Sequence, residues 1–141
     1  MKTSANGITF IKENEGYAPQ PTDDNGHLMW GHGHDQRPGE VPPASISITD
    51  ADALLAQDLA LYVEPHINAL APWVNQNQYD ALADFCYNEG PGALATMLHH
   101  GQAQVSTQLP AWCYEHVKGV VVKSSGLIAR REKEVALYDR P

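Results

Sequence analysis

The sequence has few basic residues: nine Lys and Arg stand against 17 Asp and Glu, which gives a formal net charge of -8 over 141 residues. Nucleic-acid binding depends on clustered Lys and Arg that neutralise phosphates, so this balance argues against a nucleic-acid partner. No apolar run approaches the ~20 residues of a membrane-spanning helix, so we expect no membrane insertion. Residues 1–16 lack a basic start followed by an apolar core, which predicts a chain made in the cytoplasm without a signal peptide.

Cysteine is equally scarce, with only Cys86 and Cys113. A chain of this length suits a single domain over residues 1–141, which can bury roughly two thirds of its unfolded surface without disulfides or metals. Both cysteines fall in apolar stretches that we expect to be helical, which favours two buried reduced thiols; a disulfide is the alternative in an oxidising compartment. No His or Asn motif frames either cysteine, which argues against a catalytic thiol.

What the sequence does contain near its start is a helix followed by a hairpin. Ser4 or Asn6 can cap the first helix and Gly16 can end it. Asn-Gly within residues 24–27 is a strong hairpin signal, with a return strand over residues 28–30. Loops are expected around Pro19 and Pro21, at the glycine-rich residues 31–34, and over residues 35–48.

The rest of the chain has helical periodicity. A helix from Thr49 to about Leu70 should kink or break at Pro65. Further helices are expected at residues 75–90, 94–100, 104–116 and 127–138. Since the pattern is mostly helical with one small hairpin, the sequence predicts an α+β fold.

Three carboxyl groups could face each other across a groove: Glu15 at the end of the first helix, and Asp23 and Asp24 at the hairpin. Glycoside hydrolysis needs one protonated carboxyl group that donates to the leaving oxygen and one ionised carboxylate on the other side of the sugar. A carboxyl at a helix C-terminus faces the negative end of the helix dipole, which helps to keep it protonated. This favours Glu15 as the acid; the alternative is that all three are solvated surface residues.

Two other clusters have simpler interpretations. His27, His32, His34 and Asp35 are residue types that bind zinc, but no His-Glu-x-x-His helix accompanies them, so we expect turn-lining histidines and no metal. The segment 130–134 contains two arginines and two glutamates at salt-bridge spacing, which predicts an exposed face of the last helix for most of these residues.

Taken in order, these segments resemble the phage-type lysozymes, glycoside hydrolase family 24. Glu15-Gly16, the Asp-bearing hairpin with Gly26, and Gly-His-Gly-His at 31–34 resemble the family's Glu-Gly, Asp, Gly and Thr-x-Gly-x-Gly-His. Residues 48–59, 77–90 and 126–134 are similar to three of its helical motifs, the last being Gly-Leu-x-x-Arg-Arg-x-x-Glu. The resemblance covers nearly the whole chain.

The resemblance implies a muramidase that cuts the β-1,4 bond between N-acetylmuramic acid and N-acetylglucosamine. It also implies two lobes, a small hairpin lobe and a helical lobe, with peptidoglycan glycan strands bound between them and no cofactor. Glu15 is then the acid, and Asp23 or Asp24 activates water. Spacing from Glu15 selects Asp24, whereas spacing from Gly26 and the hairpin register favour Asp23. The family's Asn and Arg near the acid correspond to Asn88 and Arg130, as contacts to the substrate or to the acid.

One position departs from the family, because its Thr falls on Met29. Methionine cannot hold the attacking water by a hydrogen bond as a hydroxyl can. The activity is then weak, or uses another group such as Thr22 or His32, or is lost. The alternative function is a weakened or inactive peptidoglycan-binding module on a lysozyme fold.

The expected place of action is the bacterial cell wall, reached by release or delivery. Because cell walls are usually anionic, an acidic protein gains no electrostatic steering toward them. We expect a monomer. The sequence does not distinguish a phage endolysin from a tail lysozyme or a secreted antibacterial effector.

Overall fold

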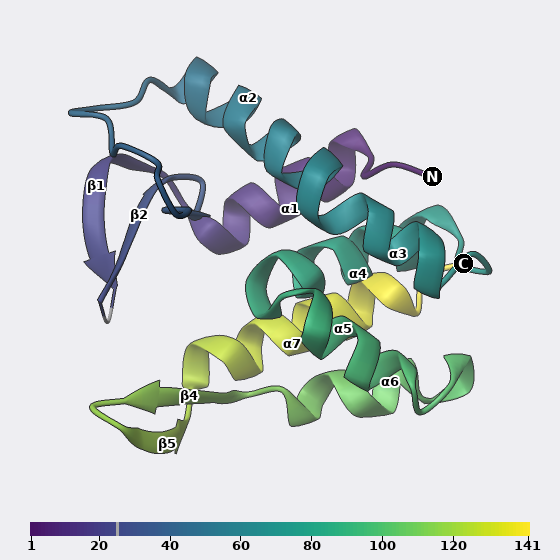
Figure 1. Cartoon of the computed structure of the whole chain (residues 1–141). Helices are drawn as coiled ribbons and strands as arrows, with labels where there is room; N and C mark the ends of the chain where they lie inside the picture. The colour runs from purple at the N-terminus through teal and green to yellow at the C-terminus, as the bar shows by residue number, and fades with distance from the viewer. Residues whose placement is uncertain (25) are drawn as a thin grey trace.

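The structure, a computed structural model, describes residues 1–24 and 26–141, except for the side chain of Asp24, and consists of a small β-lobe and a larger helical lobe (Figure 1). The small lobe contains three strands: β1 (Ala18–Asp24), β2 (His27–Gly31) and β3 (His34–Asp35). The long helices are α1 (Ala5–Glu15), α2 (Ile48–Asp58), α3 (Glu64–Leu70), α4 (Gln76–Glu89), α5 (Pro91–Leu98) and α7 (Ser125–Tyr138). The mostly helical α+β fold with a small hairpin lobe is confirmed.

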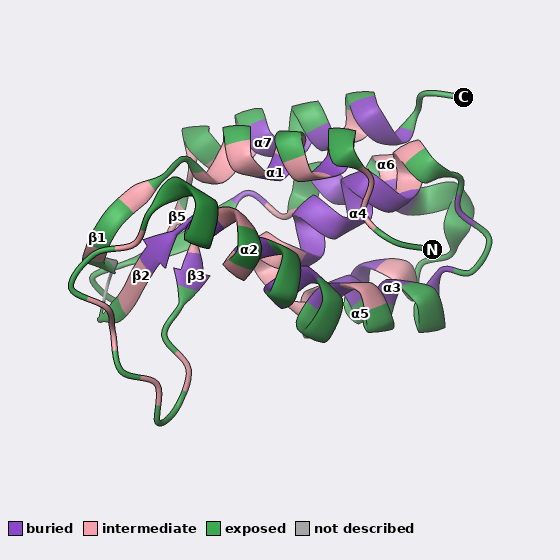
Figure 2. Cartoon of the chain, turned by 90° about the horizontal axis from the view of Figure 1, so that it is seen from above, coloured by how far each residue is buried: buried purple, intermediate pink, exposed green. Residues whose placement is uncertain are grey.

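The core forms around α4, which contacts α1, α3, α5 and α7. Residues 79–86 of this helix are all buried (Figure 2), as expected for a helix surrounded by others. Its start follows from a capping box in which Asn75 and Gln78 bond each other's backbone N–H. The expected helix starting at Asn75 and ending near Gly90 is therefore confirmed.

The first helix also follows its local signals. Ser4 Oγ accepts a hydrogen bond from the Gly7 N–H, which satisfies one of the unpaired donors at the start of α1. Gly16 ends the helix at φ 75°, a backbone conformation that few residues other than glycine adopt easily. Glu15 is consequently the last residue of α1, at the junction of the two lobes.

The small lobe contains more strand than we expected. The three strands form one antiparallel sheet in the order β1-β2-β3. The expected loop at Pro19 and Pro21 is wrong, because both residues lie within β1. This strand is at the edge of the sheet, where proline is tolerated because its missing N–H does not interrupt the hydrogen bonds between central strands. The glycine-rich stretch is not wholly irregular either, since Gly31 ends β2 and His34 begins β3.

The long helix after residue 48 is interrupted slightly before the expected position. It opens into a π-helical turn, Leu59–Val63, and restarts as α3 with Pro65 in its first turn. The Glu64 N–H bonds to the Leu59 carbonyl, five residues back. Proline has no N–H donor and its ring crowds the preceding helical turn. A wider π-helical turn just before Pro65 accommodates both effects.

The single helix expected over residues 104–116 is wrong. The chain forms short helical turns over Gln102–Gln104, α6 (Val105–Gln108) and Leu109–Ala111, then a second hairpin, β4 (Tyr114–Val117) and β5 (Val120–Lys123). Pro110 lies in the last of these turns, where it prevents continuation of α6. Lys118 and Gly119 both have positive φ, 50° and 76°, as a two-residue hairpin turn requires.

Two smaller differences follow. The helix α5 begins at Pro91 rather than at residue 94, since proline fits the first helical turn. Cys113 lies just before β4 rather than on a helix, but both cysteines are free and buried, as expected.

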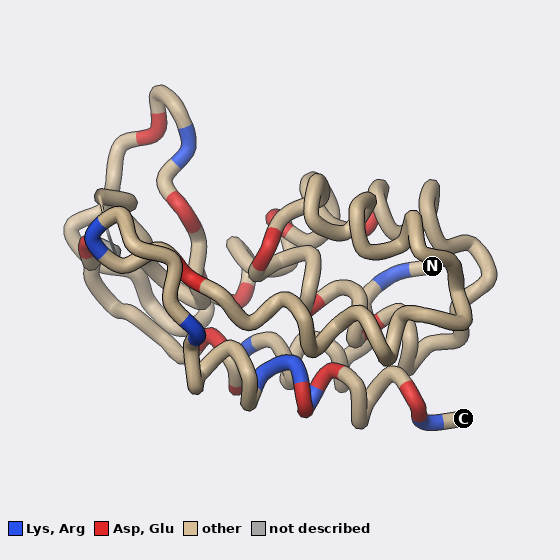
Figure 3. The backbone as a smooth tube through the Cα atoms, turned by 90° about the horizontal axis from the view of Figure 1, so that it is seen from below, with Lys and Arg blue, Asp and Glu red and all other residues tan. Residues whose placement is uncertain are grey.

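No helix in the described part of the chain is long and apolar enough to cross a membrane. Acidic positions are spread over both lobes in Figure 3, in keeping with the net charge of -8.

Candidate active site

Glu15 lies at the centre of the candidate site, with its carboxylate held from two sides. Arg130 Nη2 lies 2.6 Å from Glu15 Oε1, and the side chain of Glu15 is only 14% exposed. The turn between β2 and β3 closes over the other oxygen, because a Cβ atom added to Gly33 would lie 2.6 Å from Oε2. The φ of 80° at Gly33 favours glycine, and any larger residue there would also displace the Glu15 carboxylate.

This environment changes the acidity of Glu15. Burial raises its pKa; Arg130 opposes that shift, and the nearby charges of Asp84 and Asp35 reinforce it, so the pKa is raised overall. A carboxyl group with a raised pKa keeps its proton closer to neutral pH, which is what a general acid needs.

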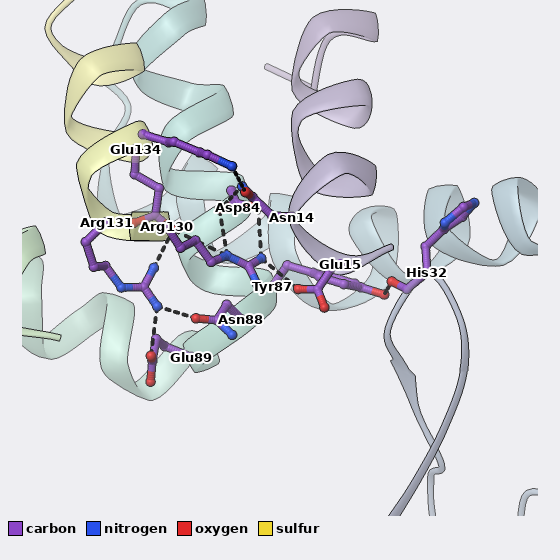
Figure 4. A network of polar contacts seen from close by, with 11 residues as sticks. Asn14, Glu15, His32, Asp84, Tyr87, Asn88, Glu89, Arg130, Arg131 and Glu134 are labelled. Carbon is purple, nitrogen blue, oxygen red and sulfur yellow. Dashed lines mark hydrogen bonds and ion pairs between the residues drawn. The ribbon is translucent and has the colours of Figure 1, made fainter. Parts of the chain in front are cut away.

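Arg130 connects Glu15 to a buried carboxylate behind it (Figure 4). Its Nε and Nη2 donate to the two oxygens of Asp84 at 2.9 and 2.8 Å. Asn14 Nδ2 donates to Asp84 at 3.2 Å from α1. Asp84 is fully buried, so Arg130 is fixed by a two-point bond before it reaches Glu15.

Arg131 makes a second cluster beside the first. It bonds Glu134, Asn88, Glu89 and the carbonyl of Trp112, the last two at 2.8 Å. The expected exposed face of the last helix is wrong for these residues: Arg130, Arg131 and Glu134 are all buried. Burial raises the pKa of Glu134, the negative charge of Asp84 reinforces that shift, and Arg131 opposes it, so the pKa is raised overall.

An open groove passes in front of Glu15. One part of it, about 240 Å³, is lined by Glu15, His27, Met29, Gly33, Asp35, Tyr87 and Asn88. A second part, about 260 Å³, shares Gly33, Asp35, Tyr87 and Asn88 with the first, so the two adjoin. The structure thus brings the expected residues Met29 and Asn88 into the groove with Glu15, whereas Arg130 reaches Glu15 from behind.

The hairpin register bears on the two aspartates. Thr22 pairs with Met29, Asp23 with Leu28 and position 24 with His27. Met29 and His27 line the groove, and alternate strand residues point to opposite faces, so Asp23 lies on the face away from it. Asp23 Oδ1 instead accepts a hydrogen bond from the Gly26 N–H at 2.8 Å. The side chain of Asp24 lies outside the described part of the chain.

His32 does not reach the groove. It is 4% exposed, and its ring nitrogens lie 2.8 Å from the Gly16 carbonyl and 2.8 Å from Asp52. Its own carbonyl accepts from the Tyr87 hydroxyl at 2.9 Å. The expectation that His32 contacts substrate is therefore not met in this structure: its ring anchors the end of α1 to α2.

His34 holds the loop after β3 against α2. Its ring nitrogens lie 2.6 Å from Asp58 and 2.9 Å from Glu40. Burial lowers its pKa, but the bonds to Asp58 and Glu40 outweigh that effect and raise it overall. Across the residues that the structure describes, no group of three or more His, Cys, Asp and Glu is placed to hold a metal ion.

The His34 contacts predict a pH-dependent stability. A raised pKa contributes stability that is fully present below the unfolded value of 6.5 and is lost as the pH rises through the folded value. The pKa of Glu40 is lowered overall, because the Arg37 amide and His34 outweigh slight burial, so its contribution is lost as the pH falls through that lower value. Replacing His34 with Gln should cost about 1.5–3 kcal/mol near pH 5.5 and much less near pH 9. Denaturant unfolding at both pH values measures this, with the exposed His100→Gln as control; an equal loss at both would contradict it.

Sequence reasoning missed several residues of this site. Asp35 was considered only as a zinc ligand, an interpretation that the sequence argues against, and Asp84 and Tyr87 were included only within the helix expected over residues 75–90. The signal for Asp84 is an acid within eight consecutive buried positions of α4, where an unpaired charge is very unfavourable. The sequence did not reveal its partner, Arg130, which lies 46 residues away.

A largely buried glutamate with a raised pKa at a helix end, an arginine behind it and a groove between a hairpin lobe and a helical lobe define a lysozyme-type protein. The comparisons with known proteins agree. The chain belongs to the phage lysozyme family, whose sequence model matches residues 12–134. The endolysin of Salmonella phage P22 is 37% identical over 98% of both chains. The endolysin of Bacillus phage PZA is 34% identical over 99% of this chain, but the match covers only 55% of that relative. The chain thus spans about half the length of some relatives.

Solved structures give the same fold. The muramidase domain of SpmX from Asticaccaulis excentricus has a TM-score of 0.81 and 31% identity, with 99% of both chains covered. A P22 lysozyme mutant has a TM-score of 0.76 and 29% identity over 98% of both chains. The fold resemblance therefore includes both the hairpin lobe and the helical lobe.

Proposed function

We propose that this protein hydrolyses the β-1,4 bond between N-acetylmuramic acid and N-acetylglucosamine in peptidoglycan. The observation that supports this most is Glu15: a largely buried carboxyl group with a raised pKa, held against Arg130 at the bottom of an open groove. In the reaction Glu15 donates its proton to the glycosidic oxygen as the bond from the anomeric carbon to that oxygen breaks. A water oxygen bonds to the anomeric carbon, and a second carboxylate takes the proton of that water. No step requires a cofactor.

The products test the proposal directly. Purified cell walls are incubated with the protein, and the released fragments are analysed by mass spectrometry after borohydride reduction. A muramidase leaves N-acetylmuramic acid at the reducing end. Reducing-end N-acetylglucosamine, or a 1,6-anhydro product, contradicts the proposed reaction.

The alternative is a module that binds peptidoglycan without cutting it. The observation that favours it is Met29, an apolar side chain that lines the groove beside Glu15. Co-sedimentation of the protein with insoluble cell walls, without release of soluble fragments, supports this alternative. Release of fragments by the unsubstituted chain excludes it.

We further propose that the chain acts as a monomeric single domain on the bacterial cell wall. The chain matches nearly all of one relative and about half of another. Both release from a lysing cell and delivery as part of a larger assembly are consistent with such a domain.

For the second hydrolytic carboxylate we propose Asp24 rather than Asp23. Asp23 pairs with Leu28 on the far face and caps the hairpin turn, whereas position 24 pairs with His27, which lines the groove. Asp24→Asn should reduce turnover by about a hundredfold or more, and Asp23→Asn by only a few-fold. Fragment release at equal protein concentration measures both, and each variant is the other's control because the charge change is the same. A larger loss in Asp23→Asn would reverse the assignment.

A further inference from the structure

Most polar side chains that line the groove are already engaged. Glu15 is bound to Arg130. The Tyr87 hydroxyl donates to the His32 carbonyl, and Asn88 Oδ1 accepts from Arg131. These side chains are therefore held in fixed orientations by protein partners, and Glu15 is the proposed proton donor.

Among the acidic side chains of the groove, Asp35 is the exception. It lines both parts of the groove, and its carboxylate makes no hydrogen bond or ion pair with any residue the structure describes. The other acids nearby are engaged: Asp52 with Lys12 and His32, Asp58 with His34, and Asp84 with Arg130. A carboxylate that faces a groove without a protein partner is available to a ligand or to water.

The position of Asp35 is set by the β-sheet. In the β2–β3 ladder Asp35 pairs directly with Met29. Directly paired residues share one face with Cβ atoms roughly 4.5–5.5 Å apart, so a polar acceptor adjoins the apolar Met29. Asp35 also follows Gly33, whose turn packs against the Glu15 carboxylate. Its negative charge raises the pKa of Glu15, consistent with that proximity.

We propose that Asp35 is a catalytic carboxylate that holds the attacking water by accepting a hydrogen bond from it. The inference rests on the proposed muramidase function. One hydrogen of the water points to Asp35 and stays bonded to the water oxygen; the other transfers to the base as the oxygen bonds to the anomeric carbon. The leaving oxygen receives the proton of Glu15, so atoms and charges balance. Met29 supplies no acceptor at this point beyond a weak sulfur.

His27 is the other groove-lining side chain that could accept. It pairs with position 24 at the turn end of the hairpin, whereas Asp35 is opposite Met29, two residues closer to Gly31. An ionised carboxylate also has more free lone pairs than an imidazole nitrogen and makes a stronger, charge-assisted bond. The geometry therefore favours Asp35.

The test compares Asp35→Ala and Asp35→Asn in full kinetics on solubilised glycan strands. The alanine variant should lose about a hundredfold in kcat with little change in KM, since orientation of the water affects only the chemical step. The asparagine variant should lose less, about tenfold, because its amide oxygen still accepts a hydrogen bond. Glu132→Ala, which removes an exposed acid of α7, is the matched control and should leave both constants unchanged.

Two further measurements test the position of Asp35, and the first of them separates water positioning from a structural role. Met29→Thr combined with Asp35→Ala places a hydroxyl on the same face, and should recover at least tenfold of the lost kcat. Loss of the Asp35 charge should also lower the pKa of Glu15, so the alkaline limb of the kcat–pH profile should move to lower pH in both single variants. The recovery by Met29→Thr is the readout that a structural defect would not produce, whereas the shift of the alkaline limb reports that the Asp35 charge lies near Glu15.

The inference is overturned if Asp35→Ala retains turnover within about threefold of the parent. Equal losses in Asp35→Ala and Asp35→Asn with no recovery by Met29→Thr also overturn it, because they indicate proton transfer rather than water holding. An inactive parent chain would instead overturn the proposed function itself, which keeps the two failures distinct.

Discussion

Glu15→Gln is expected to reduce the rate of glycan cleavage by about a hundredfold to ten-thousandfold, because the glutamine amide cannot donate the proton that the leaving oxygen requires. The substitution preserves size, and its amide oxygen can still accept the bond from Arg130 that Oε1 accepts at 2.6 Å. The fold should therefore remain intact, with a melting temperature within a few degrees of the parent. Clearing of a cell-wall suspension gives the rate, and the same preparation gives the thermal melt.

The matched control is Glu13→Gln, since Glu13 is exposed two residues earlier on α1. It makes the same charge change on the same helix without touching Arg130, and it should clear cell walls at the parent rate. If Glu15→Gln still clears them within a few-fold of the parent, Glu15 is not the acid.

The same residue sets the expected pH dependence. The acid must be protonated, so activity should be lost as the pH rises through the pKa of Glu15, which burial and the charges of Asp84 and Asp35 raise above 4.5 despite Arg130. The alkaline limb should therefore lie above the pH at which an ordinary glutamate ionises. Asp84→Asn should move it to lower pH, because the charge of Arg130 would then act on Glu15 without compensation.

Helix ends could be predicted from the sequence where their capping residues lie within a few positions of each other. The start of α1 at Ser4 and its end at Gly16, and the Asn75–Gln78 box at the start of α4, depend on local hydrogen bonds and backbone conformation. The β4–β5 hairpin was missed although Val117-Lys118-Gly119-Val120 contains its turn, because an apolar helical pattern in the preceding residues was extended too far.

The electrostatics of the site could not be predicted in the same way. Arg131 and Glu134 have the spacing of an exposed salt bridge, and only the fold shows that both are buried beside Asn88, more than 40 residues away in the chain. Likewise, the choice between Asp23 and Asp24 depends on a strand register that a counted spacing does not fix when one residue is missing from the segment. Asp35 becomes a candidate only when β3 pairs it with Met29.

Arg130→Met should have the largest effect on stability, with a loss of about 3–5 kcal/mol in the free energy of unfolding. Methionine fills similar space, but Asp84 has no exposed surface and, among the hydrogen bonds of the described residues, would retain the one from Asn14 at 3.2 Å. A buried carboxylate without a charged partner lowers the free energy of unfolding by far more than the ion pair had raised it. Turnover should also fall, by about tenfold to a hundredfold, since Glu15 loses the group that orients it.

The double variant Arg130→Met with Asp84→Leu separates these two effects. It removes the stranded charge and replaces the buried pair with apolar side chains, which is often neutral for stability, so most of the lost free energy of unfolding should return. Activity should not return, because Glu15 still lacks its bond to Nη2. Guanidinium unfolding and fragment release on the parent and both variants measure the two properties. A double variant no more stable than Arg130→Met would show that Asp84 is not left unpaired, and a double variant with parental turnover would show that Arg130 does not orient the acid.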